Sequence, residues 1–374
     1  MGKICLIVGT RPEIIKVAPV VMEFRQRGFD DFLLINTGQH KDLAEPYWSL
    51  FGLTPDYNLS IMTPGGGLGQ LTSRAFQQLD DLFIEIQRST TIDAVLAQGD
   101  TTTVMVSSVL SFYRGIPFVH LEAGLRSYDL QNPFPEEFNR KVTTIVTHLH
   151  LAPTSNAKKN LISEGVSENR VEVIGNTVVD ALNFVRSSPL FSAANFANDQ
   201  LNGVFDKYSK YVLITCHRRE NHGINLTELM KAVASLATEQ CDTLFIWPVH
   251  PNPNVKSKVM LNSNLTVLKN ILLVDPLEYL DIIKVLSKCH KVISDSGGIQ
   301  EEAPSFKVPV LVLRSATERN EAIEAGLSKL VKPIAYRIIE DYHNFAPVFD
   351  QDFKNPFGDG LSAKRVAQLL INLQ

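Results

Sequence analysis

Short apolar runs alternate with longer segments of helical periodicity along the whole chain. A short apolar run between turn residues fits a strand that is buried on both faces, and apolar residues at every third or fourth position fit a helix that covers it. The pattern therefore predicts an α/β protein built from β-α-β units with parallel sheets. The strands are expected at 4–9, 32–38, 94–99, 118–123, 148–152, 171–175, 211–215, 244–249, 271–274, 291–294 and 310–313.

The two halves of this pattern each form their own series of strands and helices. We therefore expect two Rossmann-like doubly wound domains that face a central cleft, with ligands at the carboxyl ends of the strands. The first domain is expected at 1–175, with a hinge near Gly175, and the second at 176–359. The polar segment 187–207 is interpreted as a connection rather than a core element. A final helical stripe in 360–374 is expected to rejoin the N-terminal domain.

Charge and cysteine content narrow the class of protein. The 374 residues contain 36 Lys and Arg against 40 Asp and Glu, so there is no basic surplus to track nucleic acid. No apolar run approaches the roughly 20 residues that span a bilayer, and we expect no membrane partner. The four cysteines form no Cys-x-x-Cys pair, which indicates a reduced, cytoplasmic protein without structural zinc. We expect no metal, because His148-x-His150 has no evident third ligand.

The first expected strand is followed by Gly9, Arg11 and Lys16 at the start of a helix. Two cations near a helix N-terminus suit a phosphate or a polar sugar, but they also suit a solvated helix surface. A single glycine does not make the dinucleotide fingerprint, which needs three. This segment is therefore a candidate binding loop without a nicotinamide cofactor.

A second glycine-containing turn lies in the second half, where Ser296, Gly297 and Gly298 lead from a strand into a helix. Backbone N–H groups without side chains in front of them cradle a diphosphate in this arrangement, although a plain tight turn has the same composition. Glu302, one turn into the helix, is placed to accept hydrogen bonds from ribose hydroxyls, and Arg319 is a candidate for the same cleft.

Three carboxylates and a histidine follow strands: Asp100, Glu122, Glu136 and His217. Asp100 and Glu136 also stand where helix caps and first turns favour acids. Glu122 ends an apolar strand, where a carboxylate is costly unless it is paired or used. Together the three carboxylates suit the acid and base of a proton-transfer reaction. His217 suits a phosphate contact or a proton relay, against the alternative of simple packing.

Five motifs in this order make the chain resemble the non-hydrolysing UDP-N-acetylglucosamine 2-epimerases. They are GTRPE at 9–13, GDTTT at 99–103, EAGLR at 122–126, HRRE at 217–220 and SGGIQEEAP at 296–304. The resemblance implies a glycosyltransferase-B type fold, a UDP-sugar substrate, no cofactor and usually a homodimer. It also implies interconversion of UDP-GlcNAc and UDP-ManNAc by anti elimination of UDP to 2-acetamidoglucal and re-addition, supplying ManNAc-type sugars for bacterial surface polysaccharide.

The same resemblance assigns roles to individual positions. Its catalytic positions fall on Asp100, Glu122, Glu136 and His217. Its substrate-binding positions fall on Arg11, Lys16, Ser296, Gly297, Gly298, Glu302 and Arg319. Some bacterial members have a second, activating UDP-GlcNAc site, and parts of it match Gln39, His40, Arg218 and His250.

Other functions remain open from the sequence. Relatives with the same catalytic frame act on modified sugars such as UDP-2,3-diacetamido-2,3-dideoxyglucuronate. A glycosyltransferase of the same fold would need an acceptor site and would not need three carboxylates. A hydrolysing 2-epimerase would release free ManNAc and UDP.

Overall fold

The computed structural model describes residues 2–39, 41–63, 65–193, 195–349 and 352–373, without the side chains of residues 41–43 and 219. The chain divides into two compact units, and each is described by itself. Unit 1 comprises residues 1–184 and 357–374, and unit 2 comprises residues 185–356. Among the described residues, no helix is both long and apolar enough to cross a membrane.

Unit 1 is built on a parallel sheet of seven strands with the order β3-β2-β1-β4-β5-β6-β7. Its central strands are buried on both faces, which is why they appear in the sequence as continuous apolar runs. The strands are β1 (Lys3–Val8), β2 (Phe32–Asn36), β3 (Tyr57–Asn58), β4 (Ile92–Gln98), β5 (Phe118–Leu121), β6 (Leu149–Ala152) and β7 (Val171–Val173).

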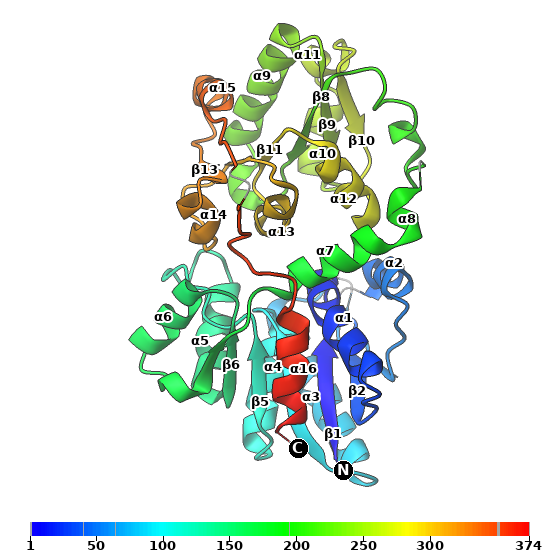
Figure 1. The fold of residues 1–374 in the computed structure, drawn as a ribbon, viewed down its shortest axis with the longest axis vertical. Helices are drawn as coiled ribbons and strands as arrows, with labels where there is room; N and C mark the ends of the chain where they lie inside the picture. Colours follow the sequence, from blue (N-terminus) through cyan, green and yellow to red (C-terminus); the bar gives the residue numbers. More distant parts are fainter. Residues whose placement is uncertain (1, 40, 64, 194, 350–351, 374) are drawn as a thin grey trace. The chain divides into compact units, whose positions relative to one another are not determined.

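Helices cover both faces of this sheet (Figure 1). The C-terminal helix packs beside α1, so the two ends of the chain share one layer. The helices are α1 (Arg11–Gln26), α2 (Lys41–Phe51), α3 (Leu68–Gln87), α4 (Thr102–Tyr113), α5 (Glu136–Val146), α6 (Ser155–Ser163), the 3-10 turn η1 (Glu168–Arg170), α7 (Thr177–Ser187), which runs on into unit 2, and α16 (Ser362–Ile371).

Unit 2 is built on a second parallel sheet, of six strands with the order β10-β9-β8-β11-β12-β13. Its core lies on both sides of the sheet and includes Phe245 and Trp247, which are fully buried. The strands are β8 (Lys210–Thr215), β9 (Thr243–Pro248), β10 (Ile271–Val274), β11 (Lys291–Ser294), β12 (Val310–Val312) and β13 (Ser328–Leu330).

The helices of unit 2 include several of less than two turns. They are α8 (Pro189–Ser192), η2 (Asp199–Leu201), η3 (Arg219–Asn221), α9 (Ile224–Glu239), α10 (Pro253–Met260), α11 (Ser263–Thr266), α12 (Tyr279–Lys288), α13 (Gly297–Glu302), η4 (Ala303–Phe306), α14 (Asn320–Glu324) and α15 (Ala335–Asn344). Both sheets are parallel and doubly wound, so the Rossmann-like fold class expected from the sequence is confirmed.

The structure departs from the sequence expectations at the edges of the elements. Two edge strands, β3 and β13, were not expected, because two or three residues are too few to form a pattern. The strand expected at 118–123 ends at Leu121. Glu122 has a φ of 67° and Gly124 a φ of 95°, a left-handed backbone that leaves the sheet.

The division between the units falls at Phe184 rather than at residue 175. The start of α7 belongs to unit 1 because the backbone N–H of Asn176 donates to Phe357 O at 2.7 Å. Asp180 accepts hydrogen bonds from the first N–H groups of α16, those of Ser362 and Ala363, at 3.3 and 3.0 Å. These contacts tie α7 and α16 to the same body.

The segment 187–207 is more than the connection that the sequence suggested. Phe196 and Leu201 are buried in the core of unit 2. The buried carboxylate of Asp281 accepts hydrogen bonds from the backbone N–H groups of Ala197 and Asn198. The polar composition of this segment concealed two core residues because they are isolated rather than periodic.

Candidate functional site

The predicted site residues gather at the carboxyl ends of the strands in each unit. In unit 1 the strand order reverses between β1 and β4, and in unit 2 it reverses between β8 and β11. Ligands of doubly wound sheets bind at such switch points, because the loops after the two strands separate there. Asp100 follows β4, while His217 and Ser296 follow β8 and β11.

Glu122 is a buried carboxylate at the end of β5, where its left-handed backbone turns the chain out of the sheet. The Lys16 ammonium, on α1, forms an ion pair with Glu122 Oε2, and each side chain is 7% exposed. Asn176 Nδ2 donates to the same oxygen at 3.3 Å. The ion pair compensates the cost of burying the charge, so the structure brings together two residues that the sequence predicted separately.

Asp100 lies between β4 and α4 and is held from α5. Arg140 donates to Asp100 Oδ2 through Nε at 2.9 Å, and Arg140 Nη2 lies 2.7 Å from the same oxygen. Asn139 Nδ2 donates to the carbonyl oxygen of Asp100 at 2.8 Å. On the other side, His120 Nε2 donates to Gly99 O at 2.7 Å. Burial lowers the pKa of His120 to about 4, so its ring is neutral and fits this donor role.

Glu136 is the first residue of α5, and Glu137, beside it, is fully buried. Glu137 accepts hydrogen bonds from the backbone N–H groups of Ser127 and Tyr128 at 3.0 and 3.2 Å, and Arg140 Nη1 donates to it at 3.1 Å. Helix α5 therefore carries Glu136 and also holds Asp100 through hydrogen bonds from Arg140 and Asn139.

Arg11 is exposed at the first residue of α1, and the loop before it is braced by Glu13. Glu13 Oε2 accepts hydrogen bonds from the N–H groups of Gly9 and Thr10 at 2.5 and 3.2 Å. Burial raises the pKa of Glu13 to about 7 in spite of these hydrogen bonds. Thr10 and Glu13 thus form a capping box, and it holds the loop that carries Arg11.

In unit 2, His217 is paired with Asp295, a residue that the sequence analysis did not single out. His217 Nδ1 lies 2.9 Å from Asp295 Oδ1, and the carboxylate is fully buried. Burial alone would raise the pKa of Asp295, but the His217 side chain, Asn221 and the Arg218 N–H together lower it to about 2. A donor at Nδ1 fixes the tautomer of the ring and leaves Nε2 as its accepting nitrogen.

Ser296, Gly297 and Gly298 open α13, as predicted, and Ser296 Oγ accepts a hydrogen bond from Ile299 N at 3.5 Å. The guanidinium of Arg319 lies directly over Gly297. A Cβ at Gly297 would stand 3.0 Å from Arg319 Cζ, so a larger residue there would have to displace the guanidinium by a few tenths of an ångström. Glu302 is the last residue of α13 and is buried.

Arginines and glutamates lie together in this part of unit 2. Burial and the neighbouring guanidinium groups of Arg314 and Arg319 lower the pKa of Arg218, although Glu318 and Glu220 act in the opposite direction. Arg319 Nε donates to the buried carboxylate of Glu301 at 2.9 Å, which fixes its orientation. Arg319, which lies over Gly297, suits an anion such as a diphosphate, whereas Arg314 is paired with Glu318 and Glu220.

The positions that match an activating site are divided between the units. In unit 1, Gln39 Oε1 accepts hydrogen bonds from the N–H and hydroxyl of Thr103 at 3.3 and 2.8 Å. His40 lies outside the described residues. In unit 2, the rings of His217 and His250 stack with their centroids 6.2 Å apart, and Arg218 Nε donates to Asp295 O at 3.0 Å.

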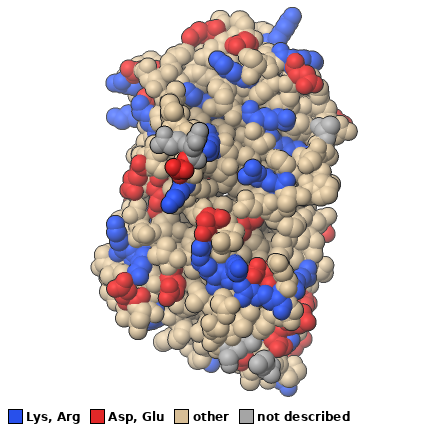
Figure 2. Space-filling model, viewed as in Figure 1, with Lys and Arg blue, Asp and Glu red and all other residues tan. Residues whose placement is uncertain are grey.

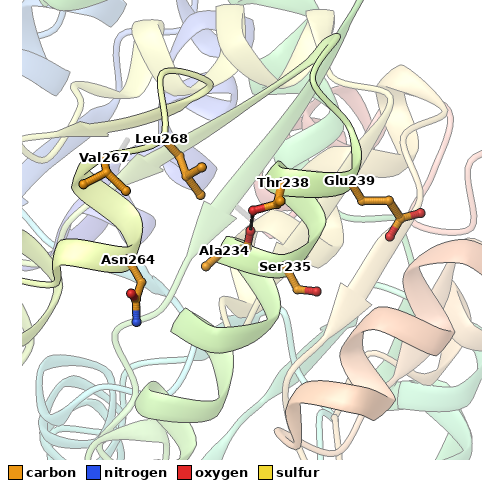
Figure 3. Close-up of a pocket in the computed structure, with 7 residues that line it drawn as sticks. All are labelled: Ala234, Ser235, Thr238, Glu239, Asn264, Val267 and Leu268. Atoms are coloured by element: carbon orange, nitrogen blue, oxygen red, sulfur yellow. Dashed lines mark hydrogen bonds between the residues drawn. The ribbon is translucent and has the colours of Figure 1, made fainter.

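A surface pocket of unit 2 lies elsewhere (Figure 3). It is formed by the last turns of α9 with α11 and the residues after it. Its seven lining residues include no predicted site residue: they are Ala234, Ser235, Thr238, Glu239, Asn264, Val267 and Leu268. Since α9 starts near His217 and runs back along the sheet, its end lies at the amino-terminal edge, away from the predicted site residues at the carboxyl ends of the strands.

Four residues that act on the predicted site were missed by sequence reasoning: Asn176, Glu137, Arg140 and Asp295. Only Asp295 carried a signal, as an acid at the end of an apolar strand. Glu137 and Arg140 form an i,i+3 pair on α5, whereas the other partners lie 40 to 78 positions apart along the chain, where no local pattern marks them. On the drawn face of both units, acidic and basic side chains occur together (Figure 2).

Comparison with known proteins places this geometry in a family. The family model described as UDP-N-acetylglucosamine 2-epimerase matches residues 22–371. The UDP-N-acetylglucosamine 2-epimerase of Escherichia coli K12 is 39% identical over 377 residues, covering 99% of this chain and 98% of that protein. That of Neisseria meningitidis is 38% identical, covering 99% of both chains.

Solved structures agree. The UDP-GlcNAc 2-epimerase from Neisseria meningitidis, determined with UDP-GlcNAc bound, has a TM-score of 0.89 and 38% identity, covering 99% of this chain and 100% of that one. The enzyme from Methanocaldococcus jannaschii in complex with UDP-GlcNAc and UDP has a TM-score of 0.83 and 31% identity, covering 99% of both. The chain therefore belongs to the UDP-N-acetylglucosamine 2-epimerase family of isomerases.

Proposed function

We propose that this protein interconverts UDP-GlcNAc and UDP-ManNAc. A base removes the proton from C2 of the sugar, the C1–O bond to the diphosphate breaks, and UDP departs with the bonding electrons to leave 2-acetamidoglucal. UDP then re-forms the C1–O bond, and an acid returns a proton to the opposite face of C2. No net oxidation occurs, so the reaction needs no redox cofactor.

The proton transfers are assigned to the carboxylates of unit 1. Glu122, Asp100 and Glu136 stand at the carboxyl edge of one sheet, and the first two are oriented by Lys16 and Arg140. Carboxylates serve as general bases, and the paired cation holds each of these two in one orientation. Lys16 is in this role a partner of Glu122 as well as a candidate for substrate binding.

The departing diphosphate is assigned to unit 2. The turn at Ser296, Gly297 and Gly298 offers backbone N–H groups, and the Arg319 guanidinium above Gly297 adds a fixed cation. Charge that develops on a leaving diphosphate is best stabilised by such preorganised donors. His217, with Asp295 at Nδ1, is assigned to the diphosphate or to proton transfer as UDP leaves. Glu302 is assigned to the ribose, and Arg11 to the phosphates or the sugar.

The observation that supports this proposal most is the buried Lys16–Glu122 ion pair in a chain of this family. The test is incubation of the purified protein with UDP-GlcNAc in deuterated water, without added cofactor, while proton NMR follows C2. The proposal expects UDP-ManNAc with deuterium at C2.

Other products would select other functions. Free ManNAc with UDP would indicate the hydrolysing reaction. No conversion of UDP-GlcNAc, with conversion of a modified UDP-sugar, would move the activity to that sugar. Transfer of the sugar to an acceptor without inversion at C2 would indicate a glycosyltransferase. The product is expected to feed synthesis of surface polysaccharide in the cytoplasm, where reduced thiols such as those of the four free cysteines persist.

Activation by substrate is part of the proposal. Gln39, His40, Arg218 and His250 match parts of the activating UDP-GlcNAc site of some relatives, and His250 stacks on His217. Turnover of UDP-ManNAc alone is then expected to rise sigmoidally and to become hyperbolic when a little UDP-GlcNAc is added. Hyperbolic kinetics with UDP-ManNAc alone would contradict activation.

We also propose that the protein is a homodimer through α4 and α5 of unit 1. These helices pack side by side, and near their ends Phe112, Tyr113 and Ile145 are 61, 74 and 79% exposed. Such exposed apolar side chains favour burial against a second copy. Ile145→Glu is expected to give monomers in sedimentation velocity, whereas Leu261→Glu, at an 82% exposed site of unit 2, is expected to leave the mass unchanged.

A further inference from the structure

We propose that Arg140 and Glu137 are positioning residues of the epimerisation, which hold the carboxylate of Asp100 in its working orientation from helix α5. The inference rests on the proposed function, in which Asp100 handles the proton at C2. It extends that function to two residues that touch Asp100 or its partner, without requiring them to touch the sugar.

The carboxylate of Asp100 needs such support because of where it stands. Gly99, immediately before it, has a φ of 89°, and Asp100 lies in the turn that leads to α4. Its side chain is 25% exposed, so the surrounding protein encloses it only in part. Hydrogen bonds from Arg140 and Asn139 therefore help to set the direction of its carboxylate.

Arg140 provides a two-point grip on one oxygen. Nε and Nη2 both reach Asp100 Oδ2, at 2.9 and 2.7 Å, and the Arg140 side chain is only 4% exposed. Two donors on one oxygen fix the position of that oxygen, and the planar guanidinium sets the direction from which it is held. Asn139, one residue earlier on the same helix, holds the backbone of Asp100 through its carbonyl oxygen at 2.8 Å.

Glu137 in turn holds the guanidinium. Its fully buried carboxylate receives Arg140 Nη1 at 3.1 Å and two backbone N–H groups from the turn at Ser127 and Tyr128. A carboxylate fixed by three donors cannot follow Arg140 if the arginine moves. The hydrogen-bonded series from Glu137 through Arg140 to the carboxylate of Asp100 is therefore held in place along its whole length.

The same helix begins with Glu136, the third proposed catalytic carboxylate. The helix that carries Glu136 therefore also holds Asp100, so α5 links the positions of the two residues. This matters for an enzyme that takes a proton from one face of C2 and returns one to the other, since displacement of a reacting group by about 1 Å can cost 100-fold in rate.

The test compares Arg140→Lys, Arg140→Gln and Glu137→Gln with the unmodified protein, using UDP-GlcNAc and UDP-GlcNAc deuterated at C2. Lysine keeps the charge but cannot make the two bonds to Asp100 and the bond to Glu137 together. We expect kcat to fall about 10-fold in Arg140→Lys and Glu137→Gln and about 100-fold in Arg140→Gln, with KM and UDP affinity within about 3-fold. The deuterium effect on kcat should increase in all three, because proton transfer becomes slower than the other steps.

Arg27→Gln is the matched control. Arg27 Nε donates to Glu23 Oε1 at 2.7 Å at the far end of α1, so the variant also loses an arginine–carboxylate pair of unit 1. It should retain kcat and the isotope effect. Arg140→Lys is the conservative variant, because it keeps the positive charge. Circular dichroism and the melting temperature show whether each variant is folded.

The possible outcomes distinguish a positioning role from substrate binding and from a purely structural role. Turnover at the normal rate in Arg140→Lys and Glu137→Gln would overturn the positioning role while leaving the proposed function intact. A rise in KM larger than the fall in kcat would also overturn it, since it would make Arg140 a substrate ligand. A fall in kcat that only matches a loss of folded protein in circular dichroism, with an unchanged isotope effect, would assign the pair to stability alone. Absence of turnover by the unmodified protein would overturn the proposed function and the inference with it.

Discussion

Replacing Asp295 by asparagine removes a buried charge from the centre of four donors. The carboxylate, which is fully buried, accepts hydrogen bonds from the backbone N–H groups of His217 and Arg218 at 3.0 and 2.9 Å and from Asn221 Nδ2 at 2.9 Å. His217 Nδ1 lies 2.9 Å from its other oxygen. An asparagine accepts with one oxygen only, and its amide N–H groups would face donors.

The magnitude follows from the pKa. The pKa of Asp295 is lowered to about 2, so the carboxylate contributes roughly 2 kcal/mol to the free energy of unfolding at pH 7. Because the folded pKa is the lower one, this contribution is complete above about pH 5 and falls to about half by pH 3. The unmatched amide adds about 1–3 kcal/mol, for a total of roughly 3–5 kcal/mol at pH 7.

The assay must report on unit 2, because the two units need not unfold together. The chain has two tryptophans, Trp48 in unit 1 and Trp247 in β9 of unit 2. The side chain of Trp247 is fully buried. In a Trp48→Phe background, Trp247 fluorescence follows the urea unfolding of unit 2 with and without Asp295→Asn, at pH 7 and pH 3. Asp180→Asn, at a half-buried acid of unit 1, is the control and should leave this transition in place.

Two results would refute the reasoning. A loss of less than about 1 kcal/mol at pH 7 would mean that the four donors do not stabilise the charge. A loss that stays equal at pH 3 and pH 7 would mean that the pKa of Asp295 is not lowered. Turnover gives a further readout, because His217 loses the acceptor at Nδ1, and we expect kcat to fall about 10-fold or more with it.

Three further predictions test the site. Glu122→Gln should lower kcat at least about 100-fold while calorimetry finds UDP affinity within about 3-fold, and normal turnover would remove this carboxylate from the mechanism. Asn176→Ala removes a donor to the same carboxylate and should lower kcat about 10-fold, and an unchanged initial rate would make that hydrogen bond dispensable. Gly297→Ala would place a Cβ 3.0 Å from Arg319 Cζ and should weaken UDP binding about 10-fold. At Gly298 the nearest atom to an added Cβ is 3.8 Å away, so Gly298→Ala should keep the melting temperature of the unmodified protein.

The sequence by itself determined the fold class and the family. Strands that are buried on both faces leave continuous apolar runs, so β1, β4 and β8 could be found without the structure. The glycine turn at Gly297 and the motifs after strands could also be found in the sequence, because each is a local pattern of adjacent residues. The polar segment 187–207 shows the limit, since two isolated core residues form no pattern.

Only the tertiary structure decided how the functional side chains are paired. Lys16 and Glu122 are 106 positions apart, Arg140 and Asp100 are 40 apart, and His217 and Asp295 are 78 apart. Each partner comes from a different strand end or helix, and the order of the strands in the sheet, which is not their order in the chain, brings them together. A sequence specifies such pairs through the whole packed sheet, so the charge that balances each carboxylate can be identified only once the sheet is formed.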